Sequence, residues 1–212
     1  AIEPEPTAAP EPEPEPETVD AAATQPLGLV ESAFFDRRKN TARVNRSGKL
    51  IDAALRWLAG HQSEDGSWDC DGFMSNCGKL GDEPCDGPGA AVHDVGVTAL
   101  ALLAFLGNGK EPRDDREHGG SILRAIEWLL AEQSPDNGRI GKPWHKSCMY
   151  DHAIATQALA EAVHATGDPR IRESLERAVT FALSAQNPYG GFRYHSPPEG
   201  DSDTSMTSWI VS

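Results

Sequence analysis

The sequence lacks the features that mark several classes of protein. It contains no run of ~18 apolar residues that would span a membrane, and no charged-then-apolar segment typical of a signal peptide. No two of its four cysteines form a C-x-x-C pair, the spacing that favours a zinc knuckle. The formal net charge is -14, and so acidic a chain is a poor match for nucleic acid, whose phosphates require Lys and Arg. We therefore expect no nucleic-acid partner.

The first 26 residues are rich in proline and glutamate. Glu-Pro-Glu-Pro recurs within residues 3–6 and 11–16, and residues 1–25 carry seven acidic groups and no basic one. Because proline fixes φ and neighbouring glutamates repel one another, residues 1–26 should form an extended, disordered linker. The segment resembles the Pro-Glu arms of bacterial proteins, which implies an extracytoplasmic domain with a membrane tether upstream of residue 1. A disordered linker without such an address is the alternative.

Residues 27–47 form a lead-in segment with a short basic run. The run could contact phospholipid or the acidic linker, but a solvated helix is the more common reason for such a pattern. It consists of Arg37, Arg38, Lys39, Arg43 and Arg46. Ser47-Gly48 then opens an organised domain, residues 48–212, which we expect to be truncated at its C-terminus because the chain ends inside a predicted helix.

Three segments of this domain repeat one pattern. Each is an amphipathic helix with an aromatic residue five positions before a glutamine, followed by a polar turn that contains glycine. The shared positions are Trp57, Gln62, Gly66 and Trp68, then Trp128, Gln133 and Gly138, then Phe181, Gln186, Gly191 and Phe192. The glutamine is expected to tie the turn to the end of its own helix.

A second helix follows each turn, and its start lies near residues 93–98, 151–156 and 202–207. The first of these helices continues through residues 99–106, which are apolar all the way round and should therefore be buried on all sides. The pattern predicts an all-α fold of repeated helix pairs, each with an amphipathic outer member and a more apolar inner member.

The segment from Gln62 to Trp68 matches the Gln-to-Gly-x-Trp pattern of the QW repeats in squalene and oxidosqualene cyclases. Gln133 to Gly138 and Gln186 to Phe192 resemble weaker copies, so the resemblance covers roughly residues 48–212. It implies an α/α toroid of the terpenoid cyclase and protein prenyltransferase type, in which helix pairs close around a central cavity. About two and a half pairs are present, too few to close that ring alone.

The resemblance also implies a catalytic acid. The cyclases protonate a polyene with an aspartic acid in an Asp-x-Asp-Asp motif, and the one candidate here is Asp201 to Ser205, with Asp203 as the acid. In one alignment Ser202 occupies the place of the family's acid, so the motif is degenerate. The competing interpretation is that Asp203, like Asp94 and Asp151, caps the start of an inner helix.

The cysteines leave several interpretations open. Prenyltransferases of this fold hold zinc with an Asp, a Cys and a His. Cys148 and His152 are residues of the types that such a site needs, but Lys146 stands where the aspartate would be. This departure favours buried structural roles for Cys148 and His152. Cys70, Cys77 and Cys85 lie within sixteen residues. The four cysteines permit two disulfides, which we favour over unpaired thiols and over a metal site. We predict neither a metal nor a cofactor.

Two functions follow from these residues and the resemblance. One is a squalene-hopene-cyclase-like isomerase that acts on an isoprenoid. The other is a non-catalytic, tethered toroid that binds a hydrophobic ligand or a protein. The inner helices are rich in Ala and Leu and poor in the aromatic faces that stabilise cations, which favours binding. A cyclase would require Asp203 to face a sealed apolar pocket.

Overall fold

The computed structural model describes residues 47–212, apart from residues 79–84, 111, 114–115, 147 and 198–199. The predicted Pro-Glu linker at 1–26 and the lead-in at 27–46, with its basic run, lie outside the described residues. Within the described part the fold is all-helical and contains no strand, which confirms the predicted fold class. No helix of that part is both long enough and apolar enough to cross a membrane.

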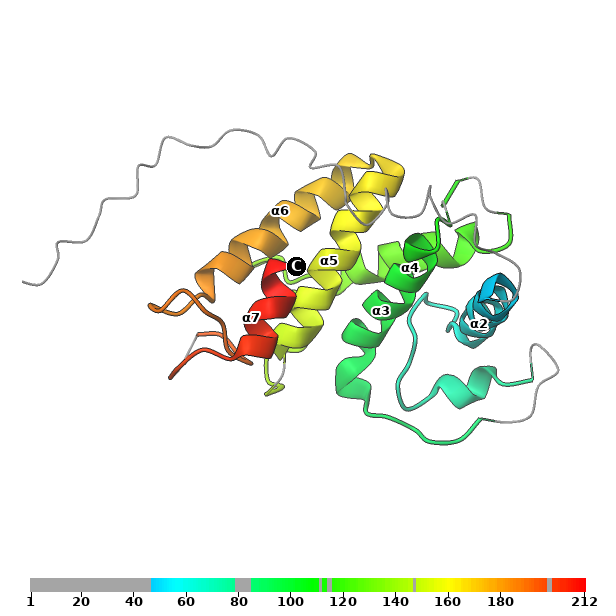
Figure 1. The fold of residues 1–212 in the computed structure, drawn as a ribbon, viewed down its shortest axis with the longest axis horizontal. Helices are drawn as coiled ribbons and strands as arrows, with labels where there is room; N and C mark the ends of the chain where they lie inside the picture. The colour runs from blue at the N-terminus through cyan, green and yellow to red at the C-terminus, as the bar shows by residue number, and fades with distance from the viewer. Residues whose placement is uncertain (1–46, 79–84, 111, 114–115, 147, 198–199) are drawn as a thin grey trace, which may run out of the picture. The chain divides into compact units, whose positions relative to one another are not determined.

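The helices alternate between an outer and an inner position. The inner helices α3, α5 and α7 follow one another side by side, while α4 packs on α3 and α6 packs on α5 (Figure 1). The α-helices are α2 (Ser47–His61), α3 (Asp94–Gly107), α4 (Gly119–Ala131), α5 (Cys148–Thr166), α6 (Pro169–Ser184) and α7 (Thr204–Val211), and two short 3-10 helices, η1 (Phe73–Asn76) and η2 (Ala91–His93), precede α3. This arrangement is that of the predicted helix pairs.

The main core lies where α3 and α5 meet. Ala155, Ala158 and Ala162 on α5 are fully buried, and side chains this small let the two helices approach closely. Phe105 and Leu102 of α3 fill the adjoining space and are also fully buried. A second, smaller core joins the starts of α5 and α7, with the large buried side chains Met149, Phe181, Phe192 and Met206.

Helix α3 is not buried on all sides, contrary to the prediction from its apolar sequence. Val97 is 37% exposed and Leu100 is 45% exposed. Ala104, one further turn along, is exposed as well. These positions follow one another at steps of three and four, so they form a single stripe along the helix. Helices α2, α4 and α5 pack against the other sides of α3, which leaves this apolar stripe open.

Gln62 joins its own turn to the next outer helix. Its Nε2 donates to the carbonyl oxygens of Gly66 and Ser121, both at 2.9 Å, and its Oε1 accepts from Arg124 Nη2 at 2.6 Å. Ser121 and Arg124 belong to α4. The bond to Gly66 ties the turn to the end of its own helix, as predicted, and the bonds to α4 add a link to a helix 59 residues further along the chain.

In the second copy, Gln133 makes the same set of hydrogen bonds as Gln62, a set that we call the clamp. Gln133 Nε2 donates to the carbonyl oxygens of Gly138 at 3.0 Å and Ser174 at 2.8 Å, and Oε1 accepts from Arg177 Nη2 at 2.6 Å. Gly138 has a φ of +79°, and a Cβ there would overlap the carbonyl oxygen of Arg177. Gly66 has the same relation to Arg124, so both clamps require glycine for its backbone conformation and for close approach.

The third copy has only the local half of the clamp among the described residues. Gln186 is exposed, and its Nε2 donates to the carbonyl oxygen of Gly190 at 2.7 Å. Gly190, with a φ of +84°, holds the position of Gly66 and Gly138, so the turn glycine predicted at Gly191 is displaced by one residue. Gly191 instead lies against Ser202, whose hydroxyl leaves no room for a Cβ.

The chain after each turn is fastened to the following inner helix. The residue two places after the turn glycine is buried, and its backbone N–H donates to an inner-helix side chain. The pairs are Trp68 with Thr98 at 2.8 Å, Ile140 with His152 at 3.1 Å and Phe192 with Thr207 at 3.0 Å. Ile140 takes the place of the aromatic residue in the second copy, a position that the sequence pattern did not reveal.

The aromatic residues five places before each glutamine have different surroundings. Trp57 is 40% exposed and stacks on His61, with ring centroids 4.0 Å apart. Trp128 packs half-buried on the main core, and Phe181 is buried against the edge of His152. The repeated feature is thus the glutamine and its turn, while the aromatic residue fills whatever space each helix pair leaves.

Candidate functional site

Asp203 lies at the start of α7 and caps that helix. Its Oδ1 accepts from the backbone N–H of Met206 at 2.8 Å and from Ser205 Oγ at 2.6 Å, while its Oδ2 accepts from Tyr194 Oη at 2.6 Å. These donors, led by the hydroxyls of Ser205 and Tyr194, lower the pKa of Asp203 to about 2. The side chain therefore has the N-cap role of the competing interpretation.

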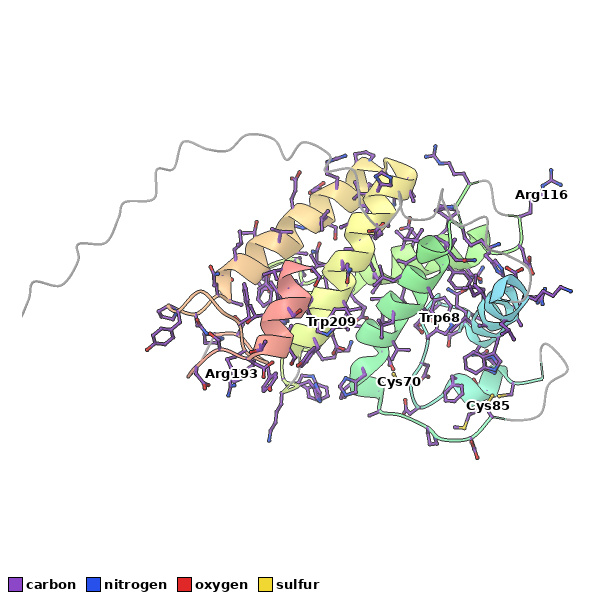
Figure 2. All side chains as sticks on the ribbon, viewed as in Figure 1. Trp68, Cys70, Cys85, Arg116, Arg193 and Trp209 are labelled. Atoms are coloured by element: carbon purple, nitrogen blue, oxygen red, sulfur yellow. The ribbon has the colours of Figure 1, made fainter. Side chains whose placement is uncertain are left out.

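This geometry is unlike that of an acid that protonates a polyene. Such an acid must carry its proton at working pH inside a dry pocket, whereas Asp203 is half-buried and its hydrogen bonds favour the ionised carboxylate. A pocket of about 350 Å³ is lined by Gln157, Ser205, Ser208, Trp209 and Ser212, and Asp203 is not part of this lining. Trp209 lies on α7 (Figure 2). The catalytic role of Asp203 stays a prediction that the geometry does not favour.

Asp94 and Asp151 do not cap their own helices in the way Asp203 does. Asp94 is the first residue of α3, and its Oδ1 accepts from the backbone N–H of Cys70 at 2.9 Å. Asp151 is 3% exposed and accepts from the backbone N–H of Gly96, in the first turn of α3. A carboxylate from α5 thus stabilises the N-terminus of its neighbour, a pairing that depends on helix packing and has no signal in the local sequence.

Two histidines gather around Asp151. His93 Nδ1 lies 3.8 Å from Asp151 Oδ1, and the rings of His93 and His145 meet edge to face with centroids 4.8 Å apart. Burial raises the pKa of Asp151, and the two histidines oppose that rise. One oxygen of Asp151 is buried without a hydrogen-bond partner. Sequence analysis missed this group because its members come from three separate segments.

Cys148 and His152 have the buried structural roles that the sequence favours. The Nδ1 atom of His152 accepts from the backbone N–H of Ile140, and Nε2 donates to the carbonyl oxygen of Ala178 at 3.1 Å. Both ring nitrogens are therefore engaged, which leaves neither for a metal. Cys148 Sγ lies 3.8 Å from the carbonyl oxygen of Tyr194.

His152 predicts a pH dependence of stability. Burial lowers the pKa of His152 to about 4, so the unfolded chain binds a proton near pH 6.5 that the folded chain does not bind until about pH 4. The free energy of unfolding should therefore fall as the pH falls through this window, by about 2 kcal/mol between pH 7 and pH 5. Urea unfolding of the wild type and of His152→Gln at both pH values tests this.

The His152→Gln variant should lose most of this pH dependence, while His164→Gln should keep it. His164 is on the same helix but exposed, which makes it the matched control. An equal slope in the wild type and in His152→Gln would contradict the assignment.

All four cysteines lie in the described part of the chain, and none is joined in a disulfide there. Cys70 lies near the start of α3 and Cys85 lies beside η1 (Figure 2). Burial, with Asp94 adding to it, raises the pKa of Cys70 to about 12, so its thiol is protonated and unreactive at neutral pH. Cys77 and Cys85 instead face His61. The disulfides predicted among the four cysteines stay a prediction.

Comparison with known proteins gives distant relatives. The chain is 25% identical to the squalene–hopene cyclase of Bradyrhizobium diazoefficiens over 189 residues, which cover 83% of this chain and 27% of that protein. It is 23% identical to the squalene–hopene cyclase of Zymomonas mobilis over 195 residues, 81% of this chain and 28% of that protein. The chain is distantly related to terpenoid cyclases.

A third relative supports this coarse relationship. The chloroplastic ent-copalyl diphosphate synthase 1 of Oryza sativa subsp. japonica is 28% identical over 120 residues, which cover 57% of this chain and 11% of that protein. No family model matches the chain, and no solved structure matches it significantly. The chain spans little more than a quarter of the length of the two bacterial cyclases, at 27% and 28%.

Proposed function

We propose that this chain forms part of a terpenoid-cyclase-like α/α toroid whose inner helices bind an isoprenoid or a similarly hydrophobic ligand without converting it. The observation that carries the proposal is the exposed stripe of α3, with Val97 and Leu100 at 37% and 45% exposure. In a toroid the inner helices line the central cavity, so an apolar stripe on α3 is suited to an apolar ligand.

The absence of conversion rests on Asp203. Its carboxylate is committed to the first turn of α7 and to two hydroxyls, and these bonds favour its ionised form. The stripe of α3 also consists of Val, Leu and Ala rather than the aromatic faces that stabilise carbocations. Both features fit a site that holds a ligand better than one that protonates it.

The alternative is a terpenoid cyclase that acts by protonation from Asp203. The names of the bacterial relatives favour it, because both are squalene–hopene cyclases. For that activity, the rest of the toroid would have to enclose Asp203 in a dry cavity and free it from its cap.

We further propose that the protein is exported and tethered to a membrane through the Pro-Glu segment. This part of the proposal rests on the composition of residues 1–26.

The proposal predicts that the protein retains radiolabelled squalene or a polyprenol during gel filtration. Leu100→Glu should weaken retention by about 10-fold or more, since placing a charge in an apolar contact removes the burial of a leucine and adds a desolvation cost. Leu123→Glu is the matched control, because Leu123 is 44% exposed on the outer helix α4 and should leave retention unchanged.

Two results would contradict this account. Equal retention by the Leu100→Glu and Leu123→Glu variants would show that the lipid does not bind at α3. Failure of the folded wild type to retain either lipid, together with burial of Leu100 by a co-purifying protein, would make the stripe a protein interface instead.

A further inference from the structure

Three metal-ligating side chains that are distant in sequence meet beside the end of α2. Cys77 Sγ lies 3.5 Å from His61 Nε2, and Cys85 Sγ lies 3.4 Å from the same nitrogen. The three ligand atoms all lie within 4.8 Å of one another. A tetrahedral zinc ion with ordinary bond lengths would hold a sulfur and a nitrogen about 3.6 Å apart, so these distances suit one shared ion.

The histidine is oriented as a zinc ligand. His61 is 1% exposed, and its Nδ1 lies 2.8 Å from the carbonyl oxygen of Trp57. Because a carbonyl only accepts, Nδ1 carries the proton and Nε2 presents its lone pair toward the two sulfurs. A backbone carbonyl that fixes the tautomer in this way is the usual second partner of a zinc-bound histidine. The ring is held further by stacking on Trp57.

The two cysteines are also held next to each other. The backbone N–H of Cys85 donates to Cys77 Sγ at 3.2 Å. Asn76, in η1, donates from Nδ2 to the carbonyl oxygen of His61 at 3.2 Å, so the element before Cys77 is fastened to the end of α2. The site is therefore built from a rigid helix end on one side and a tied loop on the other.

We propose that His61, Cys77 and Cys85 bind one zinc ion, which fastens the loop after Trp68 to α2. A site of two thiolates and one imidazole favours zinc over harder cations such as magnesium and calcium, which prefer oxygen ligands. Binding would release the two thiol protons to solvent. Residues 69–78 and 85–92 bury few apolar side chains, so a metal would supply cohesion that this loop lacks on its own.

The test is the metal content of the full chain, purified under reducing conditions with zinc present and then freed of loosely bound metal. The wild type should hold about one zinc ion per chain, and Cys77→Ser and Cys85→Ser should lose it. Cobalt added to the metal-free wild type should produce thiolate-to-metal charge-transfer bands that both variants lack. Cys70→Ser, in the same loop but outside the group, is the control and should keep both the zinc and the bands.

Three results would overturn the proposal. One is a folded wild type that holds no zinc under these conditions. A second is undiminished zinc in Cys77→Ser, which would place the ion elsewhere, for example at the group of His93, His145 and Asp151. The third is a thiol titration of the denatured, unreduced chain that finds Cys77 and Cys85 joined in a disulfide. Circular dichroism of each variant separates loss of metal from loss of fold.

Discussion

Replacing Gly138 with alanine is expected to lower the free energy of unfolding by about 2–5 kcal/mol. The glycine has a φ of +79°, a left-handed conformation that costs a residue with a Cβ about 1–2 kcal/mol. The added Cβ would also overlap the backbone carbonyl of Arg177, and backbone within a packed helix cannot move aside as a flexible side chain can. Overpacking of this kind costs about 1–3 kcal/mol more.

Gly190→Ala is the matched control for this prediction. Gly190 holds the same turn position in the third copy, with a φ of +84°, but the nearest atom to its Cβ is Gln186 Nε2 at 4.0 Å. The control should therefore lose only the conformational part, about 1–2 kcal/mol. Urea unfolding followed by circular dichroism measures both. Equal losses in the two variants would show that the close approach of the turn to α6 contributes nothing.

Replacing Gln133 with alanine should destabilise the fold by about 3 kcal/mol. The amide is 7% exposed and donates to the carbonyls of Gly138 and Ser174, while its oxygen accepts from Arg177. Its removal leaves two buried carbonyls and one guanidinium without these bonds, and an unsatisfied buried group costs about 1–3 kcal/mol. The same unfolding measurement detects the loss.

The control for Gln133 is again in the third copy. Gln186→Ala removes an exposed amide with one bond to the carbonyl of Gly190, and it should cost under about 1 kcal/mol. A double-mutant cycle between Gln133 and Arg177 should give a coupling energy of about 1 kcal/mol or more, since the two side chains are in contact. A coupling near zero would mean that the contact between Gln133 and Arg177 contributes nothing to stability.

The repeated helix pairs could be predicted because their signals are local. A glutamine after an amphipathic helix, a glycine four or five places later and a new helix beyond are all visible within short windows of sequence. The cap at Asp203 is local as well, since it accepts from Met206 three residues on. Such features depend on neighbouring residues and need no knowledge of how the helices pack.

The remaining features depend on packing between distant segments. Gln62 donates a hydrogen bond to the carbonyl oxygen of Ser121, 59 residues further along the chain. Asp151 accepts from the backbone N–H of Gly96 on another helix. His61, Cys77 and Cys85 lie together in the fold but do not follow a C-x-x-C spacing in the sequence. The sequence therefore favoured disulfides over a metal site. The open stripe on α3 was missed because an entirely apolar helix predicts burial, whereas one side of this helix is left uncovered.

The most direct test of the proposed function is the fate of squalene held by the protein. After incubation, the bound lipid is extracted from the wild type and from Asp203→Asn and analysed by gas chromatography and mass spectrometry. Our account predicts that both proteins return squalene unchanged, and that Asp203→Asn retains as much as the wild type because asparagine can also cap a helix. A cyclised product from the wild type that is absent from Asp203→Asn would contradict it and would make the protein a cyclase.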